Sequence, residues 1–393
     1  MRTGRPASSH YNVVIIGGGP AGCATALSLL EQGVGPVLVI EAGNYDRAKI
    51  GESLSPDIQR PLRGLGLWDD FVAAGHQPCP GNASSWGADA LGYNDFVLSP
   101  LGAGWHVDRI QFERFLANTA DGRGAELCHP CRVVGIRRSV AGAAFTIEVA
   151  GAGGPRTVGA DYLVDASGIR ACVARKMGAK RTLSDQLLCV YGFIHSTRDK
   201  PISNQTLLEA RDYGWWYRAR LPDHRLIVAL TCDADYVKSA GLRKWSRWLD
   251  HLAETEHVSS ALAGARFDPV TLGCAPAPSC RTVPCAGDGW LAVGDAASSY
   301  DPIFARGIYK AFDNALQGAE AVLRYLDGDA RAADSYQNQV DEEYFRYLEQ
   351  RSLLYAQENR WPEASFWMNR TAAAHSMGPK YRRLQAGSLF SGG

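Results

Sequence analysis

One segment, NVVIIGGGPAGCATALSLLEQGVGPVLVIE at residues 12–41, sets the fold. It opens with an apolar, mostly β-branched run at 12–16, which predicts a buried parallel strand. A segment of helical composition follows at 21–32, and a second apolar run at 36–40 ends at Glu41. Strand, helix and strand in this order predict a βαβ unit with a parallel sheet, the core of an α/β fold.

A GxGxxG loop joins the first strand to the helix. Its glycines allow a tight turn, close approach of a pyrophosphate and close packing of helix on strand. The free N–H groups at the helix N-terminus attract phosphates. An acidic residue about twenty positions further on is placed to accept hydrogen bonds from ribose hydroxyls. The unit therefore predicts a dinucleotide site formed by Gly17, Gly19, Pro20, Ala21, Gly22 and Glu41.

The composition narrows the classes of partner. The chain has 393 residues, and its 41 basic residues balance its 41 acidic ones, so neither nucleic acid nor a membrane is predicted as a partner. Ten cysteines are scattered rather than arranged as a disulfide framework, which favours a reducing, cytoplasmic setting. The one CxxC, formed by Cys128 and Cys131, lacks a second pair at metal spacing, so no metal site is predicted.

Two later segments have the pattern of a strand that ends in an acidic turn. Residues 161–168 read DYLVDASG, and residues 289–307 read GWLAVGDAASSYDPIFARG. With the loop RAKIGES at 47–53, they resemble the fingerprints of the flavin-dependent monooxygenase and halogenase superfamily over residues 11–330. The resemblance implies non-covalently bound FAD, reduction by NAD(P)H directly or through a flavin reductase, and O2 as oxidant.

The resemblance adds expected cofactor contacts. Asp295 would accept hydrogen bonds from the ribityl or pyrophosphate side of FAD, and the helix that begins at Gly307 would direct its positive end at the flavin. Arg109 stands where the superfamily places a cofactor-contacting arginine, with a surface salt bridge as the alternative. The added contacts are Ser53, Arg109, Val133, Asp295, Pro302, Gly307 and Ile308.

The predicted architecture has three parts. We expect an FAD-binding Rossmann-like domain of the glutathione-reductase and aromatic-hydroxylase type, a substrate domain built on an antiparallel sheet, and a C-terminal helical cap. There is no second GxGxxG, and the glycines at 151–154 predict a hairpin turn, so no separate nicotinamide domain is expected. The expected segments are 11–74, 102–184 and 271–330 for FAD, 75–101 and 185–270 for substrate, and 331–393 for the cap.

Three segments resemble the halogenase branch but depart from it. The WxWxIP motif of that branch corresponds to GWWYRARLP at 214–222, where Tyr217 replaces the second tryptophan. The lysine that passes halogen to substrate is missing, because its expected segment reads NASSW at 82–86 and no lysine occurs between Lys49 and Lys176. Ala-Arg at 305–306 replaces the Ser-Thr pair that cradles halide.

We therefore expect a monooxygenase that hydroxylates an electron-rich aromatic ring through a flavin hydroperoxide. The combination of IGESLSP, GWWY, DPIFARGIYKA and RWPEASFW most resembles halogenase-like tryptophan hydroxylases of the tryptophylquinone maturase type. That resemblance implies an indole side chain carried by a peptide or protein. The alternatives are a flavin-dependent halogenase, and an FAD oxidase or dehydrogenase of a small aromatic substrate.

The substrate pocket is expected to have aromatic walls. The candidates are Trp86, Trp215, Tyr217 and Phe304, for each of which an ordinary place in the core is the alternative. No catalytic residue is assigned. The candidates for that role are Glu52, in the GES loop, and Arg306, which stands beside the flavin loop and would anchor an acidic group or neutralise reduced flavin.

Overall fold

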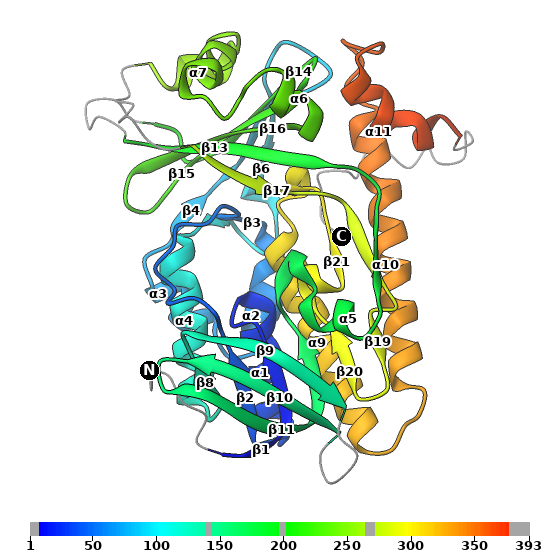
Figure 1. The fold of residues 1–393 in the computed structure, drawn as a ribbon. Coiled ribbons are helices and arrows are strands. Elements are labelled where there is room, and N and C mark those ends of the chain that lie inside the picture. Colours follow the sequence, from blue (N-terminus) through cyan, green and yellow to red (C-terminus); the bar gives the residue numbers. More distant parts are fainter. Residues whose placement is uncertain (1–7, 139–143, 196–201, 264–271, 377–393) are drawn as a thin grey trace.

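The computed structural model describes residues 8–138, 144–195, 202–263 and 272–376. Parts of the predicted substrate and C-terminal segments, at 196–201, 264–270 and 377–393, lie outside the described residues. Two large sheets occupy opposite ends of the molecule, and the long helix α10 (Ala332–Tyr355) runs beside both (Figure 1). None of the helices within the described ranges is long and apolar enough to cross a membrane.

The first sheet confirms the predicted α/β fold. It has eight strands, of which β1 (His10–Ile16) is central and pairs in parallel with β2 (Val37–Ile40) and β11 (Gly154–Asp165). Helices α1 (Pro20–Glu31) and α9 (Gly307–Leu326) pack together against it. The predicted hairpin turn joins β10 to β11. The other strands are β8 (Glu126–Cys128), β9 (Cys131–Arg138), β10 (Phe145–Gly151), β19 (Ala286–Gly287) and β20 (Trp290–Ala292).

The second sheet has seven strands and confirms the predicted antiparallel arrangement, with one parallel pair in it. Its strand order is β17-β13-β16-β15-β14-β5-β6, and β14 pairs with β5 in parallel. β5 comes from a segment remote in sequence, so no hairpin forces it to run antiparallel to β14. The strands are β5 (Gly81–Ser85), β6 (Gly92–Asp95), β13 (Leu187–His195), β14 (Thr206–Arg211), β15 (Gly214–Arg220), β16 (Arg225–Asp233) and β17 (Gly273–Pro276).

Short elements complete the two halves. Helices α6, α7 and α8 pack on the second sheet, with Trp248 and Val258 in the shared core. Because β17 pairs with β13, this strand joins the second sheet although residue 271 was the predicted start of an FAD-binding segment. The bounds are α2 (Gln59–Gly64), α3 (Trp68–Ala73), α4 (Arg109–Gly122), α5 (Cys172–Lys176), α6 (Ala234–Ser239), α7 (Trp245–Ala253), α8 (His257–Ala261), β3 (Ser53–Leu54), β4 (Gln77–Cys79), β7 (Gly104–His106), β12 (Lys180–Leu183), β18 (Cys280–Val283) and β21 (Ser298–Ser299).

The C-terminal helices connect the two halves rather than only capping one of them. Near its start α10 places Tyr336 and Val340 in the core of the first sheet. At its end it places Tyr355 in the core of the second sheet. α10 ends at Tyr355, and the chain continues past Pro362 as α11 (Ser365–Ser376).

Candidate functional site

One cavity of about 1080 Å³ is lined by both large sheets and the loops between them. The glycine loop and Glu41 line one part of it, and Trp215 and Tyr217 of β15 line another. A volume of this size is at the upper end of the range for small-molecule and cofactor sites. The cavity therefore has room for a dinucleotide and for a substrate beside it.

The glycine loop has the shape that a pyrophosphate requires. Gly17 has a φ of +114°, and a Cβ there would overlap the carbonyl oxygen of Ala166. A Cβ at Gly22 would overlap the carbonyl oxygen of Gly17, so these two glycines let the start of α1, the loop and the residue after β11 lie close together. A Cβ at Gly19 would meet no atom within 4 Å, and Gly19 lines the cavity. The loop is thus closed towards the protein and open towards a ligand.

Glu41 organises the backbone around the nucleotide end. Its carboxylate accepts hydrogen bonds from the N–H groups of Gly18 at 2.8 Å and Gly43 at 2.6 Å. Its own backbone pairs with Cys128 and Cys131, which form a disulfide, and Cys131 lines the cavity. The scattered cysteine pattern did not predict this disulfide. It forms because the end of β8 and the start of β9 converge on the backbone of Glu41.

Arg109 lies at the cavity wall in a charged cluster. Its guanidinium donates to the carbonyl oxygens of Ile50 at 2.8 Å and Gly51 at 3.2 Å, and also to Glu113. Lys49 pairs with the other carboxylate oxygen of Glu113 at 2.6 Å. Burial alone would raise the pKa of Glu113, but the two cations bring it below its ordinary value. With a side chain only 13% exposed, Arg109 is an internal residue that fixes the loop before Glu52.

A second charged pair lies at Asp295. This side chain is half exposed and lines the cavity, and Lys310 donates to it at 3.0 Å. Lys310 is buried, also donates to the carbonyl oxygen of Ser298, and has its ammonium 4.8 Å from the ring centre of Tyr300. Neither Glu113 nor Lys310 was singled out from the sequence. The i,i+4 spacing of Arg109 and Glu113, which α4 places on one face, was the available signal for the first.

A buried carboxyl group lies towards the substrate end. Glu52 is 3% exposed, and burial raises its pKa, although its hydrogen bond with Tyr217 and the nearby Arg109 oppose the shift. The N–H of Gly51 donates to it at 2.9 Å. The hydroxyl groups of Tyr217 and Ser53 are 2.6 Å apart. Glu52, Ser53 and Tyr217 all line the cavity, which places a buried carboxyl group next to an aromatic wall.

The remaining candidates lie outside the cavity wall as the structure describes it. Trp86 donates from its indole to the carbonyl oxygen of Leu354 at 3.0 Å and packs among aromatic side chains. Phe304 packs edge-on against Tyr347. Arg306 faces Asp57 at 3.5 Å with a side chain 44% exposed. The predicted residues that do line the cavity are Gly17, Gly19, Pro20, Ala21, Glu41, Glu52, Ser53, Arg109, Val133, Trp215, Tyr217, Asp295, Pro302, Gly307 and Ile308.

Comparison with known proteins agrees with this geometry. A family model described as an FAD binding domain matches residues 10–342. The chain belongs to this FAD-binding family. The flavoprotein is 32% identical over 365 residues to LodB of Marinomonas mediterranea, named as an FAD-dependent oxidoreductase, and the match covers 92% of this chain and 97% of LodB. It is 30% identical to the 1H-pyrrole-2-carbonyl-[peptidyl-carrier protein] brominase of Pseudoalteromonas luteoviolacea, over 81% and 79% of the two chains.

Solved structures share the fold. The flavin-dependent halogenase CmlS superposes with a TM-score of 0.82 at 25% identity, over 97% of this chain and 71% of CmlS. The peptidyl tryptophan dihydroxylase QhpG, essential for tryptophylquinone cofactor biogenesis, superposes with a TM-score of 0.73 at 24% identity, over 92% and 78% of the two chains. The flavoprotein is therefore an FAD-dependent oxidoreductase of the monooxygenase and halogenase superfamily.

Proposed function

We propose that this flavoprotein hydroxylates an electron-rich aromatic ring, an indole side chain carried by a peptide or protein. Trp215 and Tyr217 form an aromatic wall beside the acid Glu52 and would hold a flat ring by stacking or edge contacts. FAD, reduced by NAD(P)H directly or through a flavin reductase, would supply the oxygen atom from O2. The protein's part is to orient the ring, exclude water and hold a proton on Glu52.

The observation that carries the proposal is which segments supply the lysines that line the cavity. Within its described lining these are Lys49 and Lys176. Lys49 forms an ion pair with Glu113 at 2.6 Å, and Lys176 is the last residue of α5. None of residues 82–86, where the halogenase lysine is expected, belongs to that lining. The described lining therefore has no lysine from the segment where the halogen-transferring lysine is expected.

A protein-borne substrate is supported by the names of two similar proteins. One relative is named as a brominase of a pyrrole on a peptidyl carrier protein, and QhpG is named as a peptidyl tryptophan dihydroxylase. Halogenation is the second candidate function, because the brominase and CmlS are both halogenating enzymes by name.

The test offers the enzyme tryptophan-containing polypeptides with FAD, NADH, a flavin reductase, O2 and bromide. We expect mass spectrometry to find one or two added oxygen atoms on a tryptophan and no bromine. A brominated ring would establish the halogenase instead. Stoichiometric hydrogen peroxide without any modified product would point to an oxidase, and small aromatic compounds would then be the next substrates to offer.

Glu52 provides a second test of the same proposal. Since the pKa of Glu52 is raised, its protonated form persists above its ordinary range, and a rate that needs this proton falls as pH rises through the raised value. Glu52→Gln is expected to lower turnover by about 100-fold and to remove that fall in the pH–rate profile. FAD content, measured by absorbance, should stay unchanged. A variant with the wild-type pH profile would exclude Glu52 as the acid.

A further inference from the structure

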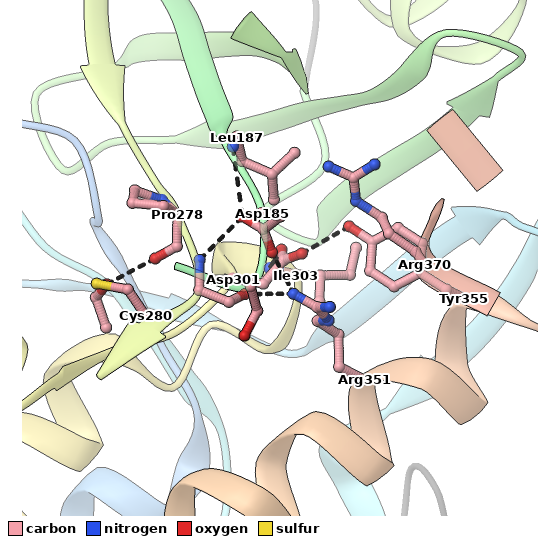
Figure 2. A network of polar contacts seen from close by, with 12 residues as sticks. Asp185, Leu187, Pro278, Cys280, Asp301, Ile303, Arg351, Tyr355 and Arg370 are labelled. Carbon is pink, nitrogen blue, oxygen red and sulfur yellow. Dashed lines mark hydrogen bonds and ion pairs between the residues drawn. The ribbon is translucent and has the colours of Figure 1, made fainter. Parts of the chain in front are cut away.

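A buried chain of hydrogen bonds joins three distant segments, and Figure 2 shows its part between Tyr355 and Asp301. The indole N–H of Trp215, on β15, donates to the hydroxyl oxygen of Tyr355 at 3.0 Å. The hydroxyl of Tyr355, at the end of α10, donates to Asp301 at 2.7 Å. Asp301 is 2% exposed and directly precedes Pro302 of the cavity wall. Tyr355 thus connects Trp215 in the aromatic wall to the loop at residues 300–302, which we call the flavin-side loop.

A second set of contacts ties the same loop to α10. The backbone N–H of Asp301 donates to the hydroxyl of Tyr347 at 2.7 Å. The ring of Tyr300, which lines the cavity, stacks on the ring of Tyr347 with 4.0 Å between centres. Arg351, also on α10, pairs with Asp185, as Figure 2 shows. The loop is therefore held by side chains that project from a single helix.

The direction of the hydrogen bonds follows from the chemistry of each group. An indole N–H can only donate, so Tyr355 must accept from Trp215 and has its own proton left for Asp301. Burial raises the pKa of Asp301 to about 6, with Asp185 adding to the shift and Arg351 opposing it. Above that pH Asp301 is an ionised acceptor, and the chain has one arrangement in which every group is satisfied.

The indole of Trp215 has a single polar atom, and its partner Tyr355 is not among the residues that line the cavity. The side chain is 2% exposed, so water does not replace a lost partner. With the N–H fixed on Tyr355, the ring presents one orientation to the cavity. Without this bond the ring would retain its packing contacts but lose the contact that selects this orientation.

We propose that Tyr355 is a positioning residue that sets the spacing between the aromatic wall at Trp215 and the flavin-side loop at Asp301. The inference rests on the proposed function for its catalytic consequence, since a ring held at the wrong distance or angle receives oxygen less often and reduced FAD is reoxidised without product. Its structural part is independent of the substrate.

The experiment compares Tyr355→Phe, Trp215→Phe and the double variant with Tyr344→Phe as a matched control. Tyr344 is another buried tyrosine of α10, and its hydroxyl bonds to Ser184 at 2.8 Å instead. The first measurement is the indole N–H spectrum of protein labelled with [15N]tryptophan, where the Trp215→Phe spectrum identifies the Trp215 signal. The second is the share of NADH oxidation that ends as peroxide rather than product.

We expect the Trp215 signal to shift in Tyr355→Phe and to stay in place in Tyr344→Phe. The ratio of peroxide to product should rise by about tenfold in Tyr355→Phe, in Trp215→Phe and in the double variant alike, because a misplacement of about 1 Å has costs of at least this size. FAD retention should match wild type in all of them.

Three other results would each lead to a different conclusion about Tyr355 and the proposed function. An unshifted Trp215 signal in Tyr355→Phe would overturn the proposal whatever the substrate is. A shifted signal with wild-type coupling, or additive losses in the double variant, would show that the bond exists but does not position the wall. A shifted signal together with no product even from wild-type enzyme would leave the positioning of Trp215 standing and reject hydroxylation of the substrates offered.

Discussion

At the scale of single residues, two glycines in one loop have opposite surroundings. Gly17 adopts a positive φ and is closed in by the backbone of Ala166, whereas Gly19 faces open space in the cavity. The first therefore serves the fold, and the second serves the ligand. Sequence spacing alone assigns both to the same motif, and only the geometry separates their roles.

A matched pair of variants tests this difference. Gly17→Ala is expected to lower the free energy of unfolding by about 3 kcal/mol, because the residue needs a left-handed conformation and its Cβ would overlap Ala166. Gly19→Ala should keep the stability of the apoprotein and weaken FAD binding. Urea denaturation of apoprotein and FAD titration measure the two quantities. Equal stability of both variants would contradict the distinction.

Residues with a named motif were predictable, and their partners were not. The sequence pointed to Glu41 by its spacing from the glycine loop, and the resemblance to the superfamily pointed to Arg109 and Asp295. Glu113 and Lys310 were not predicted as site residues. A charged side chain in a helix usually faces solvent, and its burial depends on which other elements pack over it. Whether an aromatic residue faces a cavity depends in the same way on packing.

At the scale of elements, α10 carries an ion pair inside the protein. The side chain of Arg351 is 7% exposed and that of its partner Asp185 is 9% exposed. Arg351 also donates to Ser279, whose N–H donates to Asp185 at 3.0 Å. Removal of one member of such a pair leaves the other charge buried without compensation.

Arg351→Met is therefore expected to lower the free energy of unfolding by about 3–5 kcal/mol, and Asp185→Leu combined with it should recover most of the loss. The control is Arg247→Met, in the exposed pair of Arg247 with Asp250, where the denaturation midpoint should not move. Chemical denaturation of the variants measures the effect. If the double variant were as unstable as the single one, the loss would come from packing rather than from the charge left on Asp185.

Elements with local signals were predicted well, and pairings between remote segments were not. The βαβ unit and the β10–β11 hairpin follow from periodicity and turn residues within a few positions of each other. The parallel pairing of β14 with β5 joins residues 206–209 to 82–85, and nothing in either segment records the other. Likewise, the expected helical cap at 331–393 gives no sign that one helix enters two cores.

At the scale of the whole molecule, α10 is shared by both hydrophobic cores. Val340 belongs to the core of the first sheet and Tyr355 to that of the second, and Figure 1 shows the helix passing from one to the other. Residues of both halves line the cavity. A rigid α10 would therefore keep the nucleotide end and the aromatic wall at one separation.

Arg346 lies on the exposed side of α10 between the positions that enter the two cores, so a proline there breaks the helix without removing a core side chain. Arg346→Pro is expected to cost about 3 kcal/mol or more and to split thermal unfolding into two transitions, because the halves lose their common helix. Arg346→Ala, which keeps the helix, should unfold in one transition like wild type. Calorimetry counts the transitions. FAD absorbance should show release of the cofactor with the transition of the first half, because the core of that half needs α10 only as far as Val340.

A single transition in Arg346→Pro, merely shifted to lower temperature, would mean that the contacts around the cavity couple the halves without α10.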